Sequence, residues 1–138
     1  TAGCGNMTFV GAAVAGLVGG ILVVASIEFV EKKLKIDDAI GAFSAHGTAG
    51  VWGTLVIGLW GVADPMDAST GIGIFNGGGE QLGIQAIGAL SYCAWAAITS
   101  AVVLAVLKAT IGLRVSEEVE AEGLDINEHG EKVFGILP

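Results

Sequence analysis

Three long stretches of the chain carry no charged side chain, and this pattern limits its fold more than any other feature. Residues 1–27, 39–63 and 81–107 contain no Asp, Glu, Lys or Arg and are 27, 25 and 27 residues long. A hydrocarbon core about 30 Å thick is crossed by about 20 apolar helical residues. We therefore expect an all-α integral membrane protein whose transmembrane region, residues 1–110, contains three transmembrane helices, over residues 7–30, 39–62 and 80–110.

The overall composition excludes several classes of protein. Of the 138 residues, 53% are hydrophobic and only 14% are charged, whereas about 25% are charged in an average soluble domain. The six basic and 14 acidic side chains are too few to cover the surface of a soluble domain of this size. We therefore exclude a soluble domain, a nucleic-acid binder and a disulfide-rich secreted module.

The positions of the charged residues predict an orientation in the membrane. All basic residues lie either between the first two predicted spans or at and after the third, and the 64–80 loop has none. By the positive-inside rule, the 28–38 loop and the C-terminus are cytoplasmic and the 64–80 loop faces outward. Residues 111–138 hold seven acidic and two basic residues, which accounts for −5 of the net charge of −8. This segment is therefore expected to be a cytoplasmic C-terminal tail.

Glycines recur on one face of the first and second predicted helices. Gly16 and Gly20 are four residues apart, and Gly47, Gly50 and Gly53 recur every three residues. In lipid, such small residues let helix backbones approach each other closely. Three helices are too few to bury these faces, so we expect them to pack against helices outside this chain.

Capping residues predict where two helices begin. Asp38 is placed to be the N-cap of the second predicted helix, where its carboxylate would accept hydrogen bonds from first-turn amides. Ser116 is placed to cap a short helix over 117–122, which Gly123 would end. Beyond it we expect irregular chain, which either is a solvated acidic tail or docks through its apolar residues Leu124, Ile126, Val133 and Phe134.

His46 is the one histidine in the three stretches that lack Asp, Glu, Lys and Arg. It follows Asp38 by eight residues, or about 12 Å of helix rise, which places it near the membrane midplane. Ionisable groups at this depth are costly and usually face a bundle interior or a transport pathway. The alternative is a structural histidine bonded to a backbone carbonyl. A neutral imidazole offers one donor and one acceptor, which suits a small polar solute away from water.

The remaining chemical motifs are incomplete. No phosphate-binding loop is present, and His129 lacks a second His or Cys at metal-ligand spacing. We expect no enzyme activity, no metal and no cofactor.

Three segments resemble the Amt family of ammonium transporters. The segment IDDAIGAFSAHGTAGVWGTLVIGLW resembles the tenth transmembrane helix of that family, GLRVSEEVEAEGLDINEHGE resembles its cytoplasmic C-terminal signature, and TAGCGN resembles the outer turn before its ninth helix. Family members are homotrimers of eleven-helix subunits. The resemblance therefore implies the last three transmembrane helices and the tail of a longer protein, an expectation that agrees with the absence of an initiating Met.

The resemblance also implies roles for particular residues. His46 matches the second of two paired pore histidines, in a narrow apolar conduit that ammonium enters by losing a proton. Ala42, one turn earlier, is expected to line the same pore face. Asp38 matches the carboxylate at the cytoplasmic start of this helix and is interpreted as a helix cap. The tail signature implies a regulatory role for Gly123, Asp125, His129 and Gly130.

Partners follow from the same resemblance. Besides ammonium or ammonia and the lipid bilayer, we expect a homotrimer in the cytoplasmic membrane and a P-II signalling protein at the cytoplasmic face. Ala39 stands where the family often has Pro, and Asn127 where plant members carry a regulatory Thr. Two alternatives stay open: a packing and regulatory segment that never contacts substrate, and a stand-alone three-helix membrane protein.

Overall fold

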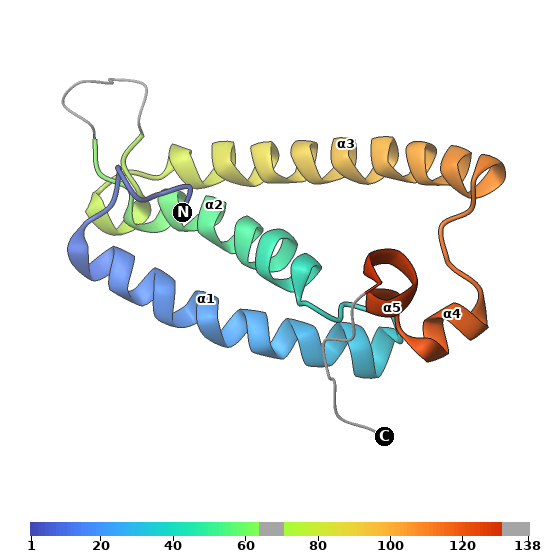
Figure 1. Cartoon of the computed structure of the whole chain (residues 1–138). Coiled ribbons are helices and arrows are strands. Elements are labelled where there is room, and N and C mark those ends of the chain that lie inside the picture. Colours follow the sequence, from blue (N-terminus) through green and yellow to red (C-terminus); the bar gives the residue numbers. More distant parts are fainter. Residues whose placement is uncertain (64–70, 131–138) are drawn as a thin grey trace. The chain divides into compact units, whose positions relative to one another are not determined.

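The computed structural model describes residues 1–63 and 71–130 of the chain. The chain forms two compact units, residues 1–94 and 95–138, and the boundary between them lies within one long helix. The described residues are mostly helical and form no β-strand beyond one isolated bridge. The α-helices, shown in Figure 1, are α1 (Phe9–Phe29), α2 (Ala49–Trp60), α3 (Glu80–Thr110), α4 (Glu117–Glu122) and α5 (Leu124–His129).

Helix α1 starts at a hydroxyl cap and continues further than the sequence predicted. The Thr8 hydroxyl accepts a hydrogen bond from the Gly11 amide at 3.1 Å, which satisfies one of the amides left over at a helix start. The helix was expected to end at Val30, but a π-helical turn, η1 (Val30–Leu34), extends it. Lys35 then ends the helix in a left-handed conformation, with φ of 55°, and its amide binds the Val30 carbonyl.

The second predicted helix begins later than residue 39. Residues 39 and 40 form a turn, and Gly41 has a φ of 66°, which glycine adopts without strain. The regular helix is preceded by a second π-helical turn, η2 (Phe43–Thr48), and α2 follows it directly. The prediction of 39–62 was therefore too long at both ends, because Gly41 turns the chain before the helix and Gly61 is extended after Trp60.

Helices α1 and α2 form an antiparallel pair (Figure 1). Met7, before α1, forms an antiparallel bridge with Gly61, after α2. Halfway along the pair, the Trp52 indole N–H donates to the Ala15 carbonyl at 3.0 Å. A Cβ atom on Gly11 would lie 2.7 Å from the Cβ of Trp60, so only glycine permits this approach.

The start of α3 packs against the end of α2. Gly58 is buried, and a Cβ atom there would collide with the Cα of Leu82. Shortly before α3, the side-chain amide of Asn76 donates to the carbonyls of Trp60 and Gly61 at 2.9 and 3.0 Å, which joins the residues before α3 to the end of α2. Helix α3 has the bounds expected from the sequence, Glu80–Thr110.

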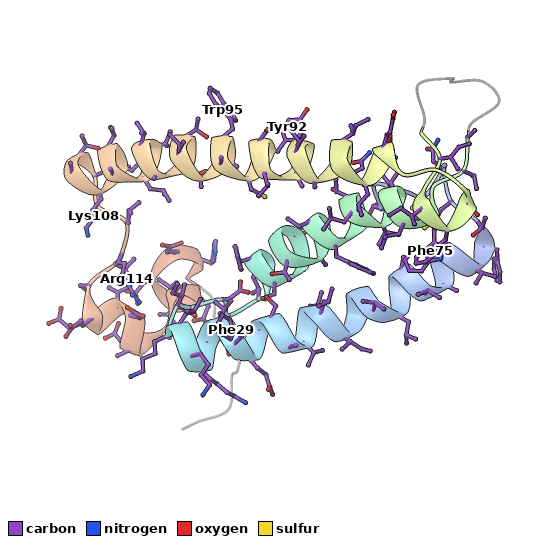
Figure 2. The ribbon with its side chains drawn as sticks, turned by 180° about the vertical axis from the view of Figure 1, so that it is seen from behind. Phe29, Phe75, Tyr92, Trp95, Lys108 and Arg114 are labelled. Carbon is purple, nitrogen blue, oxygen red and sulfur yellow. The ribbon has the colours of Figure 1, made fainter. Side chains whose placement is uncertain are left out.

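The buried hydrophobic core of the described residues is very small. Only Val30, Val56 and Ala89 are buried hydrophobic residues. Large apolar side chains on α1 and α3 are exposed instead, and Figure 2 shows Tyr92 and Trp95, exposed by 78% and 70%, projecting from the α3 ribbon. Apolar surface of this extent is normally covered by lipid or by other protein.

Among residues 1–63 and 71–130, two helices are long and apolar enough to cross a membrane, Phe9–Leu34 and Glu80–Thr110. The middle predicted span corresponds to the 18 residues of η2 and α2 and is not one of these two. A third crossing therefore stays a prediction.

The glycine faces expected from the sequence make no close contact with another helix among the residues that the structure describes. Around Gly16, Gly20 and Gly50, an added Cβ atom would meet nothing within 4 Å, and Gly47 faces only the ring of Phe43, four residues earlier. The close approaches occur at other glycines, Gly11 and Gly58. The expected packing of the two glycine faces against helices outside the chain remains a prediction.

The second unit contains two short helices after the end of α3. As predicted, the Ser116 hydroxyl accepts a hydrogen bond from the Val119 amide and α4 ends at Gly123. The expectation of irregular chain after Gly123 was wrong as far as His129, because this segment forms α5. The Asn127 side chain supports α5 by donating to the Gly123 carbonyl at 3.2 Å. Leu124 and Ile126 are exposed, and Val133 and Phe134 lie outside the described residues.

Candidate functional site

His46 lies in the middle of the π-helical turn η2. The Ala49 amide binds the Ser44 carbonyl, five residues earlier, instead of the carbonyl four residues earlier that an α-helix uses. Such turns are rare and often occur at functional sites. The His46 side chain is exposed on this chain, as is Ala42 one turn before it. The two residues that were expected to share a pore face are thus both available to a solute or to another helix.

The Asp38 carboxylate binds the start of η2. One carboxylate oxygen accepts from the Phe43 amide at 2.9 Å, and the other accepts from the amide and the hydroxyl of Ser44 at 3.1 and 2.9 Å. Asp38 and Ser44 are both buried. Asp38 therefore binds orphan amides as expected of a cap, although it acts from five and six residues upstream and is not the N-cap residue itself.

The hydrogen bonds also set the charge state of Asp38. Burial raises the pKa of the Asp38 carboxyl, but the hydrogen bonds from Phe43 and Ser44 outweigh this, so the pKa lies below its ordinary value of 3.8. The carboxylate is therefore ionised at neutral pH. A negative charge at the start of a helix is also favoured by the helix dipole.

The other end of η2 is bound to α1. The hydroxyls of Thr48 and Ser26 lie 2.8 Å apart and share one hydrogen bond. Ser26 is 9% exposed. Sequence reasoning missed Ser26, Ser44 and Thr48, because a hydroxyl residue in an apolar helix carries no signal of its partner until the helices are placed.

A hollow of about 360 Å³ lies beside His46. Small residues of η2 and α2 form most of it, and the first two residues of the chain complete it. Its lining residues are Thr1, Ala2, Ala45, His46, Ala49, Gly50, Gly53 and Thr54. Two of the predicted glycines, Gly50 and Gly53, therefore leave room next to the imidazole.

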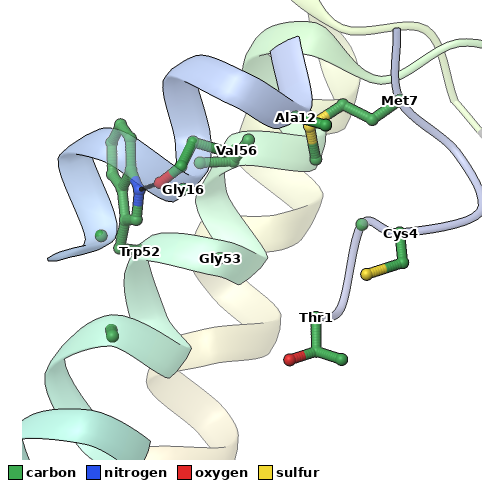
Figure 3. Close-up of a pocket in the computed structure, with 12 residues that line it drawn as sticks. Thr1, Cys4, Met7, Ala12, Gly16, Trp52, Gly53 and Val56 are labelled. Atoms are coloured by element: carbon green, nitrogen blue, oxygen red, sulfur yellow. Dashed lines mark hydrogen bonds between the residues drawn. The ribbon is translucent and has the colours of Figure 1, made fainter. Parts of the chain in front are cut away.

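A second hollow, of about 300 Å³, lies between α1 and α2 and does not include His46. Figure 3 shows Trp52, Val56 and Met7 around it, with the indole hydrogen bond to α1 drawn as a dashed line. Its lining is predominantly apolar, and the Trp52 N–H is already bonded. This hollow therefore offers little polar chemistry to a ligand.

The four predicted tail residues lie at the ends of α5, in the second unit. Gly123 joins α4 to α5 with a φ of 104°, and Asp125 is in the first turn of α5. His129 is the last residue of α5, and Gly130 ends the helix with a φ of 67°. Within the described ranges, no group of three His, Cys, Asp or Glu side chains is arranged to hold a metal ion.

Comparison with known proteins places these features in a family. The family model described as Ammonium Transporter Family matches residues 1–134. The chain belongs to the ammonium transporter family. It is 40% identical over 129 residues to "Ammonium transporter Amt1" of Haloferax mediterranei, an alignment that covers 94% of this chain and 23% of that protein. It is 36% identical over 136 residues to "Ammonium transporter" of Aquifex aeolicus, covering 99% of this chain and 31% of that protein.

A solved structure has the same fold as the chain. The "Sensor Amt Protein" superposes with a TM-score of 0.76 at 36% sequence identity, over 89% of this chain and 29% of that one. The chain thus spans about a quarter to a third of the length of the curated relatives and of this solved structure. Membership in this family and two apolar helices of sufficient length agree with a membrane protein, and the relatives are named as transporters rather than enzymes.

Proposed function

We propose that this chain is part of a transporter that passes ammonium or ammonia across the cytoplasmic membrane. Family membership supports this proposal, together with one observation that carries it: His46 is exposed in a π-helical turn, beside a hollow lined by small residues. In the proposed pore, His46 is one of a pair of histidines, and its partner lies on a helix outside this chain.

The proposed chemistry follows from the imidazole ring. A neutral imidazole has one nitrogen that donates and one that accepts a hydrogen bond. An ammonium ion that enters an apolar conduit loses its hydration, which is costly for a charge. Transfer of its proton to water outside the conduit leaves neutral ammonia, which crosses more easily, and His46 then offers polar contacts along the way. The small Ala42 side chain on the same exposed face leaves the pore open.

The proposed membrane arrangement has three crossings, made by α1, by η2 with α2, and by α3. Two of these helices have the required length and hydropathy. In this arrangement Lys32 and Lys33 of η1, Lys35 after it and the residues after α3 lie on the cytoplasmic side, as the positive-inside rule predicts. The acidic segment from residue 111 onwards is then a cytoplasmic tail.

The proposed assembly is a homotrimer whose tail takes part in regulation, with a P-II signalling protein as a partner at the cytoplasmic face. Gly123 and Gly130 support a defined tail structure, because their positive φ angles set both ends of α5. In this proposal the α4–α5 pair, with Asp125 and His129, makes the regulatory contacts.

A second candidate function is packing and regulation without substrate contact. The exposed apolar faces of α1 and α3 favour it, since they need covering by lipid or by other helices. The Gly16–Gly20 face, with open space above it, fits a helix neighbour equally well.

Transport in proteoliposomes tests the proposed function. The complete gene product is reconstituted, and ammonium-driven current and internal pH are recorded, with protein-free vesicles and a potassium gradient as controls. We expect flux that depends on protein and on ammonium but not on potassium. Equal flux with and without protein would contradict the proposal. His46→Ala separates the two candidates, because flux falls if the chain contacts the transported species and stays at the wild-type level if the chain only packs and regulates.

A further inference from the structure

The turn that carries His46 is held at both of its ends by side chains outside it. At the first end, the buried Asp38 carboxylate binds the amides of Phe43 and Ser44. At the last end, the Ser26 hydroxyl of α1 binds the Thr48 hydroxyl at 2.8 Å. Between these anchors lie only three residues, with His46 in the middle.

The Ser26 hydrogen bond differs from those of the other described hydroxyls in the apolar helices. Ser91, Thr99 and Thr110 of α3, like Thr54 of α2, each donate to the carbonyl four residues earlier in their own helix. Ser and Thr side chains inside helices commonly form this hydrogen bond to their own backbone. Ser26 instead reaches another element, at a position that is buried. Its hydroxyl therefore couples α1 to η2 rather than serving α1 alone.

The π-helical register decides where the imidazole points. A π-turn holds one residue more than the α-helical turn that would replace it, and each residue turns an α-helix by about 100°. Relaxation of η2 to an α-helix would therefore rotate His46 relative to the packed face of α2, which carries Trp52 and Val56. Glycine has a low helix propensity, so Gly47 adds little stability to η2. The hydrogen bonds from Asp38 and Ser26 at the two ends therefore do most to keep η2 in its π-helical conformation.

We propose that Ser26 is a positioning residue for His46: through Thr48 it fixes the π-helical turn at one end, while Asp38 fixes the other. This inference rests on the proposed transport function, since the orientation of His46 matters only if the imidazole contacts the transported species. Ser26 itself touches no substrate in this account.

The test removes the hydroxyl of Ser26, the hydroxyl of Thr48 or both from the complete gene product. The variants are Ser26→Ala, Thr48→Val and the double variant, and Thr48→Ser is the conservative variant that keeps the hydroxyl. Matched controls are Ser91→Ala and Thr99→Val on α3, whose hydroxyls serve their own helix. Two quantities are measured: the imidazole ¹⁵N resonances of His46 in lipid, assigned with His46→Ala, and ammonium flux.

We expect Ser26→Ala and Thr48→Val each to shift the His46 resonances and to lower flux about fivefold, the factor that corresponds to one hydrogen bond of ordinary net strength. The double variant should lose no more than either single variant, because both remove the same bond. Thr48→Ser and the two controls should match the wild type. If one single variant fails to fold, the other tests the same bond.

The outcomes separate this inference from the proposed function. Unchanged His46 resonances in a folded Ser26→Ala or Thr48→Val variant would overturn the positioning role, whatever the flux. If the resonances shift but His46→Ala leaves flux unchanged, Ser26 does orient the imidazole and the transport role of His46 is wrong. Loss of flux in His46→Ala with wild-type behaviour in both single variants would overturn the positioning role alone.

Discussion

The Asp38 carboxylate and the Ser44 hydroxyl lie 2.9 Å apart, and both residues are buried at the start of the turn that carries His46. The same carboxylate also binds the backbone amides of Phe43 and Ser44. These hydrogen bonds join the chain segment before η2 to the first residues of η2 in one hydrogen-bonded unit. The orientation of His46 depends on this unit as well as on the helix that follows.

Asp38 is expected to stabilise the protein in a pH-dependent way. Its folded pKa lies below 3.8, so its contribution is fully present above the pKa of the unfolded carboxyl and is lost as pH falls through the folded pKa. Asp38→Asn should lower the thermal midpoint at pH 5 to 8 by a constant amount, and the difference from wild type should shrink below about pH 4. The neighbouring exposed Asp37, as Asp37→Asn, is the control. A difference between wild type and Asp38→Asn that grows towards low pH would contradict this account.

Trp52→Phe removes the indole donor that joins α2 to the Ala15 carbonyl of α1. We expect the free energy of unfolding to fall by about 1 kcal/mol, the usual net contribution of a hydrogen bond. Unfolding in detergent by chemical denaturant measures it. Trp95→Phe on α3, where the side chain is 70% exposed, is the matched control. Equal losses in the two variants would show that the hydrogen bond contributes nothing.

Gly58→Ala places a methyl group against Leu82 at the contact between α2 and α3. The backbones must separate to admit it, which we expect to cost about 1–3 kcal/mol of stability. Gly88→Ala, where an added Cβ meets nothing within 4 Å, should be neutral or slightly stabilising because alanine favours helix. The thermal unfolding midpoints of both variants measure these effects. A midpoint of Gly58→Ala at or above that of wild type would contradict the close contact between α2 and α3.

Gly123→Ala should weaken the α4–α5 pair. The residue has a φ of 104°, and a Cβ atom there would lie 2.6 Å from a carboxylate oxygen of Asp125. We expect a local cost of about 1–3 kcal/mol, seen as faster amide hydrogen exchange in both short helices. Gly130→Asn should cost less, because asparagine tolerates the left-handed conformation. Amide hydrogen exchange at the wild-type rate in Gly123→Ala would contradict the claim that this position requires glycine.

The elements that the sequence predicted well are those whose signals are local. The bounds of α3 follow from a long charge-free run, and α4 follows from a serine and a glycine that fit the two ends of a helix. Helix α5 was missed because its helical segment is only six residues long, too short for periodicity to be recognised. The extension of α1 through η1 was missed because charged residues there were interpreted as a loop, although Lys32 and Glu28 form an ion pair one turn apart at 3.2 Å.

The features that the sequence could not predict depend on contacts between elements. The π-helical register of η2 follows from anchors on both sides of it, and no single residue in the turn indicates it. The glycines at which α1 and α2 approach other elements, Gly11 and Gly58, lie outside the repeating pattern that suggested packing faces. His46 itself was identifiable, because an ionisable side chain stands out in a stretch of 25 residues without Asp, Glu, Lys or Arg.

Ammonium flux through His46→Ala is the measurement that tests the central claim most directly. The variant is compared with the wild-type complete gene product in proteoliposomes, at matched protein content and with folding checked by its unfolding midpoint. Because the imidazole is proposed to bind neutral ammonia, its removal should lower flux by about fivefold or more, the factor that corresponds to one hydrogen bond of ordinary net strength. We expect at least this loss of ammonium flux, or a comparable change in the charge moved for each ammonium. Wild-type flux, selectivity and charge movement in folded His46→Ala would contradict the account.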